Sequence, residues 1–169
     1  MKLIFGGAYQ GKLEYAKSLI DENAAVYTCP DIRTCASPEE CLAAIDPAKA
    51  ISTVKPAPVI IDHLERMVYA LIDAGLDPVE YVQKNIEILR GNGGNSVTEK
   101  ENKGINAKSR IIIIEDISQG VVPIDTKERA WREANGRVMA LLAKEATSVT
   151  RVFCGIPQDI KKREINNGK

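Results

Sequence analysis

The chain begins with an apolar segment that runs directly into a glycine-rich turn and a lysine, and this stretch limits the possible folds more than any other. Residues 3–5 read Leu-Ile-Phe, and Gly-Gly-Ala-Tyr-Gln-Gly-Lys-Leu follows over residues 6–13. Gly6 and Gly11 bracket four residues, so the backbone can curl tightly and direct its N–H groups toward phosphate oxygens. A strand, such a turn and a helix in direct succession are the layout of a phosphate-binding P-loop.

The whole turn supplies candidate ligands for a nucleotide. These nucleotide-binding candidates are Gly6, Gly7, Ala8, Tyr9, Gln10, Gly11, Lys12 and Leu13. Lys12 is also a candidate catalytic residue, because an ammonium in this position reaches the β- and γ-phosphates. Leu13 departs from the pattern, since serine or threonine here would offer a hydroxyl to Mg²⁺. The alternative is a glycine-rich strand-to-helix turn that binds no nucleotide.

Composition predicts a single soluble domain over residues 1–169. Hydrophobic residues make up 44% of the chain and charged residues 27%, as in ordinary globular proteins. Lys and Arg balance Asp and Glu at 23 each, so no net charge favours nucleic acid or an anionic membrane. No segment approaches the roughly 18 apolar residues of a membrane span, so we expect a cytoplasmic protein with reduced cysteines.

Short apolar runs alternate with helical patterns along the chain. Strands are predicted at residues 25–29, 59–62, 111–114 and 149–154, in addition to the N-terminal one. Helices are predicted at residues 12–21, 38–45, 64–74 and 78–90, and from residue 126 onward, where Asp125 is the expected cap. This alternation predicts an α/β fold with a mostly parallel central sheet flanked by helices.

The segments between these elements are predicted to be irregular. Residues 52–58 form a proline-containing connector, and residues 155–157 are expected to turn the chain after the last strand, with a frayed end from residue 161. Residues 91–109 are rich in glycine and asparagine, so we expect a mobile loop there. The loop is either a functional lid or an insertion.

Three carboxylates follow predicted strands and are the remaining site candidates. Asp62 ends the run Val-Ile-Ile-Asp, as in a Walker-B strand, and Glu115 and Asp116 follow four consecutive isoleucines. Open α/β sheets bind ligands at the carboxyl ends of their strands, so Asp62 and Glu115 are candidate ligands of Mg²⁺ and Asp116 is a candidate catalytic base. Alternatively, Asp62 caps the next helix, and the other two are polar residues that end a strand.

Sequence motifs in the second half resemble one family of enzymes. The run Asp-Ile-Ser-Gln-Gly-Val-Val-Pro covers residues 116–123, and Arg129, Trp131-Arg132-Glu133 and Gly136 follow it. Together they resemble the adenosylcobinamide kinase/adenosylcobinamide-phosphate guanylyltransferase family, which has a Gly-Gly-Ala P-loop, an Asn-Glu-Val-Gly-x-Gly-x-Val-Pro segment and an Arg-x-Phe-Arg-Asp-x-x-Gly helix. The family's late Gly-x-Pro-x-x-Leu-Lys turn corresponds in register to residues 155–161.

The resemblance implies a fold, an activity and an assembly. The fold is a RecA-like P-loop NTPase fold, often assembled as a homotrimer. Members act late in cobalamin (vitamin B12) biosynthesis: with ATP or GTP they phosphorylate the aminopropanol hydroxyl of adenosylcobinamide, and they then transfer GMP from GTP through a guanylylated histidine. The implied partners are therefore a nucleoside triphosphate with Mg²⁺ and a cobinamide-type small molecule.

The chain departs from the family at several polar positions. Gln10 and Leu13 replace the two serines of the loop, and Met139-Ala140 replaces Asn-Gln after the helix glycine. Glu115-Asp116 stands where the family has Asn-Glu.

The family's guanylylated histidine also has no counterpart, because no histidine lies between Cys29 and Pro56. The only histidine is His63, and a lone histidine at a helix start is more often structural or a cap than a nucleophile. Trp131 is predicted to be a core residue rather than a base-stacking platform.

These departures leave three hypotheses about function. The leading one is a divergent kinase that has lost the guanylyltransferase step. The second is a catalytically silent descendant that acts as a nucleotide-binding or interaction module, and the third is a kinase of another small alcohol. The retained Lys12 and the paired carboxylates favour activity, whereas Gln10, Leu13 and the missing histidine favour the silent descendant.

Overall fold

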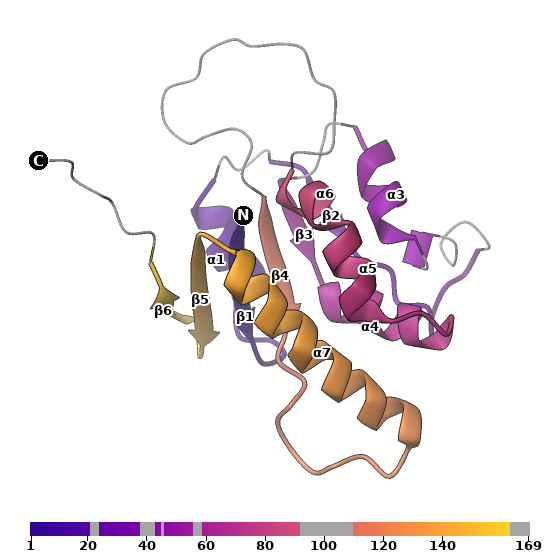
Figure 1. Cartoon of the computed structure of the whole chain (residues 1–169). Helices are drawn as coiled ribbons and strands as arrows, with labels where there is room; N and C mark the ends of the chain where they lie inside the picture. The colour runs from indigo at the N-terminus through magenta and orange to yellow at the C-terminus, as the bar shows by residue number, and fades with distance from the viewer. Residues whose placement is uncertain (21–23, 38–42, 45, 56–58, 92–109, 163–169) are drawn as a thin grey trace, which may run out of the picture.

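The computed structural model describes residues 1–20, 24–37, 43–44, 46–55, 59–91 and 110–162. Within them, one six-stranded sheet has the order β2-β3-β4-β1-β5-β6 (Figure 1). Its strands are β1 Lys2–Gly6, β2 Val26–Thr28, β3 Ile60–Asp62, β4 Ile111–Glu115, β5 Ser148–Phe153 and β6 Ile156–Lys161. The helices are α1 Lys12–Ser18, α3 Pro47–Thr53, α4 Leu64–Asp73, α5 Pro78–Lys84, α6 Ile86–Arg90 and α7 Thr126–Glu145.

The sheet is parallel except at one edge. β1 lies between β4 and β5 and pairs in parallel with both, and β2, β3 and β4 continue the parallel arrangement. Only β6 runs antiparallel, against β5. The predicted α/β fold with a mostly parallel, helix-flanked sheet is therefore confirmed.

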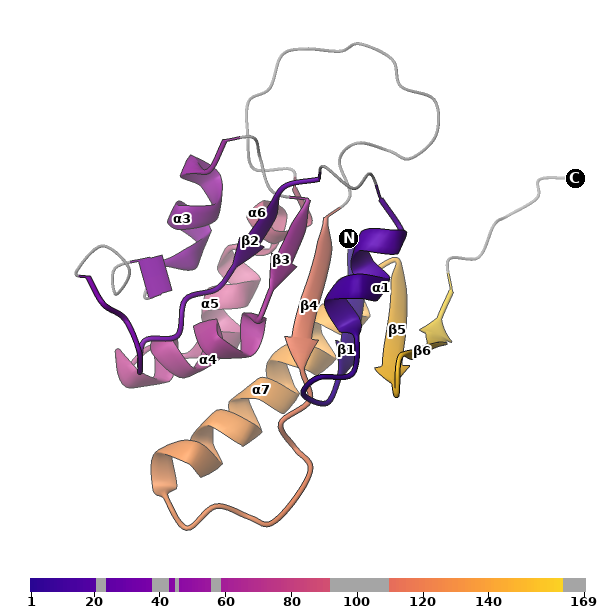
Figure 2. The ribbon, with the colours of Figure 1, turned by 180° about the vertical axis from the view of Figure 1, so that it is seen from behind.

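The four isoleucines of β4 lie between two apolar layers, which explains why this run is uniformly β-branched. Ile111 and Ile113 belong to a cluster with Ala16 of α1. Ile112 and Ile114 belong to the larger cluster, to which α4 and α7 contribute. The two views of the ribbon show α1 on one face of the sheet and α4, α5 and α7 on the other (Figures 1 and 2).

The structure corrects the sequence prediction at the C-terminal edge. Residues 155–157 were expected to form a turn and the chain from residue 161 a frayed end, but residues 156–161 form β6. Cys154 and Gly155 have φ angles of 50° and 77°, which produces a tight two-residue hairpin turn. Pro157 is tolerated because β6 is an edge strand.

Two helices also differ from the prediction. α3 occupies residues 47–53 and overlaps the predicted connector, because the Asp46 side chain accepts a hydrogen bond from the Lys49 N–H and Pro47 occupies the first turn. The helix predicted over residues 78–90 is divided into α5 and α6 at Asn85, whose φ is −106°. No described helix is long and apolar enough to cross a membrane.

Two further predictions concern residues that the structure describes little or not at all. The capped helix predicted over residues 38–45 falls mostly outside the described residues. So does the predicted loop at residues 91–109, of which only residue 91 is described.

Candidate functional site

The glycine-rich turn joins β1 to α1 at the carboxyl edge of the sheet. Lys12 is only 8% exposed, and its Nζ donates a hydrogen bond of 2.6 Å to the Gly7 carbonyl, so its ammonium is folded back over the turn. Gly11 is the N-cap of α1 with a φ of 82°, a conformation that strongly favours glycine. In the described part of the chain no side chain caps α1, so its first N–H groups are left for another acceptor.

A cavity of about 420 Å³ opens beside this turn. Its walls include the turn, the ends of β3 and β4, the first turn of α4, and α7. The lining residues are Ala8, Tyr9, Gln10, Gly11, Lys12, Leu13, Glu14, Asp31, Arg33, Asp62, His63, Glu65, Arg66, Glu115, Ile117 and Trp131. The structure thus brings Asp62 and Glu115 to the same cavity as Lys12, whereas Gly6, Gly7 and Asp116 are not among the lining residues.

Asp62 and Glu115 reach the cavity because β3 and β4 are neighbours that end at the same edge. Asp62 is buried, and its carboxylate accepts a hydrogen bond from the His63 N–H. Glu115 lies 4.0 Å from Lys12 Nζ through its Oε2 atom. Burial raises the pKa of both carboxyl groups, and at Glu115 the neighbouring carboxylate of Glu65 adds to the effect.

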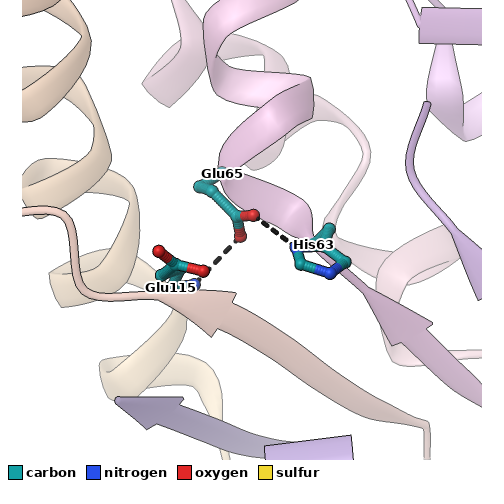
Figure 3. Close-up of side chains that lie close together, drawn as sticks. All are labelled: His63, Glu65 and Glu115. Atoms are coloured by element: carbon teal, nitrogen blue, oxygen red, sulfur yellow. Dashed lines mark hydrogen bonds and ion pairs between the residues drawn. The ribbon is translucent and has the colours of Figure 1, made fainter. Parts of the chain in front are cut away.

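Glu65 joins these elements and was not predicted from the sequence. Its carboxylate lies between the His63 ring and the end of β4 (Figure 3). Oε1 is 2.7 Å from His63 Nδ1, and Oε2 accepts a 2.9 Å hydrogen bond from the Glu115 N–H. The helical spacing of residues 65, 68 and 72 could have revealed it, because this spacing places Glu65 on the apolar side of α4.

His63 and Glu65 alter each other's pKa. The hydrogen bond that the His63 ring donates to the Glu65 carboxylate raises the pKa of His63, although burial opposes the shift. Burial by itself would raise the pKa of Glu65, but the hydrogen bonds from His63 and from the Glu115 N–H outweigh burial and lower it. Both shifts favour the charged pair, in which an imidazolium faces a carboxylate.

The pair is therefore expected to stabilise the metal-free protein most between about pH 4.5 and pH 6.5, the ordinary pKa values of Glu and His. Because the pKa of His63 is raised on folding, its contribution is complete below its unfolded pKa and is lost as the pH rises through the folded value. Because the pKa of Glu65 is lowered, its contribution is lost as the pH falls. His63 is the only histidine, so one NMR resonance in EDTA reports its titration.

Glu65→Gln should lower the pKa of His63 toward its ordinary value. Glu80→Gln, a change at an exposed glutamate of α5, is the control and should leave the His63 titration unchanged. An unchanged titration in Glu65→Gln would show that the hydrogen bond to Glu65 does not set the pKa of His63.

The residues around the cavity fit a bound Mg²⁺. Five acidic side chains line it, against three from lysine and arginine and His63, so even with His63 protonated an anionic nucleotide would meet net negative charge unless a cation accompanied it. His63, Glu65 and Glu115 place possible ligand atoms within 4.8 Å of one another. Both oxygens of Glu65 and the Oδ1 atom of Asp62 already accept hydrogen bonds, which leaves the carboxylate of Glu115 and the Oδ2 atom of Asp62 as the oxygens that suit this hard cation.

Asp116 lies apart from this group. Its backbone N–H donates to the Gly6 carbonyl, and its carboxylate accepts hydrogen bonds from the N–H and the hydroxyl of Ser118. The Asp116 side chain thus stabilises the start of the loop that follows β4. The catalytic role of Asp116 stays a prediction.

Two aromatic side chains, Tyr69 of α4 and Trp131 of α7, lie together beside the cavity. Trp131 is partly buried: it packs against the larger core cluster, as predicted, but it also lines the cavity, and its Nε1 donates a 2.8 Å hydrogen bond to the Glu65 carbonyl. The Arg33 guanidinium lies 5.0 Å from the ring centroid of Tyr69 and 5.1 Å from that of Trp131. Two hydrogen bonds to Asp31 hold this arginine in place.

Comparison with known proteins identifies a matching family. The family model for cobinamide kinase / cobinamide phosphate guanyltransferase matches residues 31–160, which is most of the chain. The matched residues include Asp62, His63, Glu65 and Glu115, whereas the glycine-rich turn precedes them. No curated protein matches the chain.

Proposed function

The chain belongs to the cobinamide kinase/cobinamide phosphate guanyltransferase family, and from this premise we propose that it is a nucleotide-dependent kinase that phosphorylates a cobinamide-type alcohol. The proposal rests chiefly on one observation. Lys12 of the glycine-rich turn lies in a common cavity with two strand-end carboxylates, Asp62 and Glu115. Phosphoryl transfer depends mostly on positioning and charge neutralisation, which such a group supplies.

Each part of the cavity has a role in this proposal. The backbone N–H groups of residues 8–13 and the first turn of α1 bind the phosphates of ATP or GTP, and Lys12 neutralises their charge. Asp62 and Glu115 hold Mg²⁺, which screens the negative charge on the phosphates. The hydrogen bond that the Glu115 N–H donates to the Glu65 carboxylate keeps the end of β4 beside the start of α4.

The guanylyltransferase step is not part of the proposal. That reaction in the family uses a histidine after the second strand, and this chain has none between Cys29 and Pro56. The kinase half needs no covalent carrier, so it can persist without that residue.

A catalytically silent descendant is the second candidate, and Leu13 is the observation that favours it. The Leu13 side chain packs against the cluster that contains Ile4 and Ala16, so it contributes to the core rather than to the binding of a metal. In that case the chain would keep the family fold as a nucleotide-binding or interaction module without turnover.

A thermal melt with ATP or GTP, with and without Mg²⁺, tests the nucleotide site. Ligand at about 100 times its Kd adds about 2.7 kcal/mol, which should raise Tm by about 5–11 °C. Leu13→Ser should increase the Mg²⁺-dependent part of the shift, because serine adds a metal-binding hydroxyl. No shift with either nucleotide would contradict the kinase proposal.

Turnover then separates the two candidates. If the wild-type chain binds nucleotide and converts cobinamide with ATP or GTP to a phosphorylated product, the kinase proposal holds. Binding without any phosphorylated product would favour the silent module. Phosphorylation of other small alcohols but not of cobinamide would indicate a changed acceptor.

A further inference from the structure

The turn between β5 and β6 lies directly against the glycine-rich turn. This hairpin turn, residues 154–155, connects Phe153 to its partner Ile156 across two residues with positive φ. Gly155 Cα lies 3.6 Å from the position that a Cβ on Gly11 would take. Two turns that are far apart in the sequence are therefore in van der Waals contact.

Gln10 makes the polar contacts between these turns. Its side-chain Oε1 accepts a hydrogen bond of 2.5 Å from the Cys154 N–H, and its backbone carbonyl accepts one of 3.2 Å from the Gly155 N–H. Gln10 also lines the cavity. A serine at this position has a side chain two atoms shorter and could not make the same side-chain contact from the same backbone position.

The contact with Cys154 also fixes the orientation of the amide group. A backbone N–H can only donate, so the atom that faces it must be Oε1, and Nε2 lies on the opposite side. Within the described residues, Nε2 has no hydrogen-bond partner. The Gln10 amide thus contacts the hairpin turn through Oε1, and its Nε2 group remains available as a hydrogen-bond donor.

From these contacts we propose that Gln10 is a positioning residue, which holds the phosphate-binding turn in its binding conformation by fastening it to the β5–β6 hairpin. The inference rests on the proposed nucleotide site and extends it to residues 154–155, which do not line the cavity. It also explains why glutamine stands at a serine position of the family loop. The glutamine side chain is long enough to accept a hydrogen bond from the Cys154 N–H of the hairpin.

The first test compares Gln10→Met with Gln83→Met. Methionine keeps the length of the side chain but accepts no strong hydrogen bond, and Gln83 is an exposed residue of α5. Gln10→Met should weaken the binding of Mg²⁺-ATP or Mg²⁺-GTP roughly three- to tenfold, the effect of about one hydrogen bond, and Gln83→Met should not. Unchanged affinity in Gln10→Met would overturn the proposal.

Hydrogen exchange of the nucleotide-free protein tests the fastening itself. Gln10→Met should speed amide exchange at Cys154 and Gly155, whose N–H groups donate hydrogen bonds to Gln10, whereas Gln10→Glu, which keeps an acceptor oxygen, should restore the protection of Cys154. If the wild-type protein bound no nucleotide, the proposed function would fail, and the exchange rates would still test the contact between the two turns. Unchanged exchange at Cys154 and Gly155 would show that Gln10 does not hold the two turns together.

A change in the hairpin tests the same coupling from the other side. Gly155→Ala strains a residue with φ of 77°, and Gly75→Ala strains one with φ of 73° at the end of α4, where no atom lies within 4 Å of the new Cβ. Both should lose similar stability, but only Gly155→Ala should weaken nucleotide binding. Equal affinities in the two variants would contradict the inference.

Discussion

Gly6→Ala is expected to destabilise the protein by more than about 3 kcal/mol, and this is the largest stability effect that we predict. A Cβ at Gly6 would lie 2.2 Å from the carbonyl oxygen of Val152 in the neighbouring strand β5. That oxygen belongs to the backbone of a strand paired with β1, so it cannot move without opening the sheet. Since domains are stable by only about 5–15 kcal/mol, much of the total would be lost.

Urea denaturation followed by circular dichroism measures this loss. Gly7→Ala is the matched control, because a Cβ there meets only Gln10 Cγ, at an ordinary 3.6 Å. The control should lose less than about 1 kcal/mol. Equal stabilities for Gly6→Ala and the wild type would show that β1 and β5 are farther apart than the structure places them.

The sequence predicted the parts of the fold that depend on local patterns. Four consecutive isoleucines between polar segments indicated a strand buried on both faces, and β4 is that strand. Asp62 and Glu115 were placed at strand ends, and parallel pairing of β3 with β4 then brings them to one edge. The P-loop assignment also relied on spacing; Lys12 lines the cavity, and nucleotide binding by the turn stays a prediction.

The sequence missed contacts between residues that are far apart in the chain. Glu65 reads as an ordinary acidic residue in the first turn of a helix, and its role appears only when β4 brings the Glu115 N–H to it. Gln10 likewise showed no local reason to replace a serine, because its partner Cys154 lies in the β5–β6 hairpin, far away in the sequence. Neither contact follows from periodicity or propensity.

Two misses have a local explanation. Asp46-Pro47 caps α3 as Asp77-Pro78 caps α5, but only the second pair was recognised, because the next residues of α3 are small and polar and show little apolar periodicity. β6 was missed because all of its residues are exposed and Pro157 interrupts the pattern. An exposed edge strand has no apolar alternation to reveal it.

Lys12→Met is expected to weaken nucleotide binding roughly 30-fold or more, because it removes the one basic side chain that the turn contributes to the cavity. Methionine fills similar space, so the free protein should unfold within about 1 kcal/mol of the wild type even though the hydrogen bond to Gly7 is lost. Calorimetric titration with Mg²⁺-ATP and Mg²⁺-GTP measures the affinity, and a melt without nucleotide confirms folding.

Lys17→Met is the matched control for this prediction. Lys17 is an exposed lysine of the same helix that does not line the cavity, so its loss changes the net charge equally without touching the site. A large loss of affinity in Lys12→Met alone would support direct phosphate binding by Lys12. Equal affinities in both variants would favour the alternative that residues 6–13 are a structural turn between β1 and α1, because a nucleotide bound there would have to meet the Lys12 ammonium.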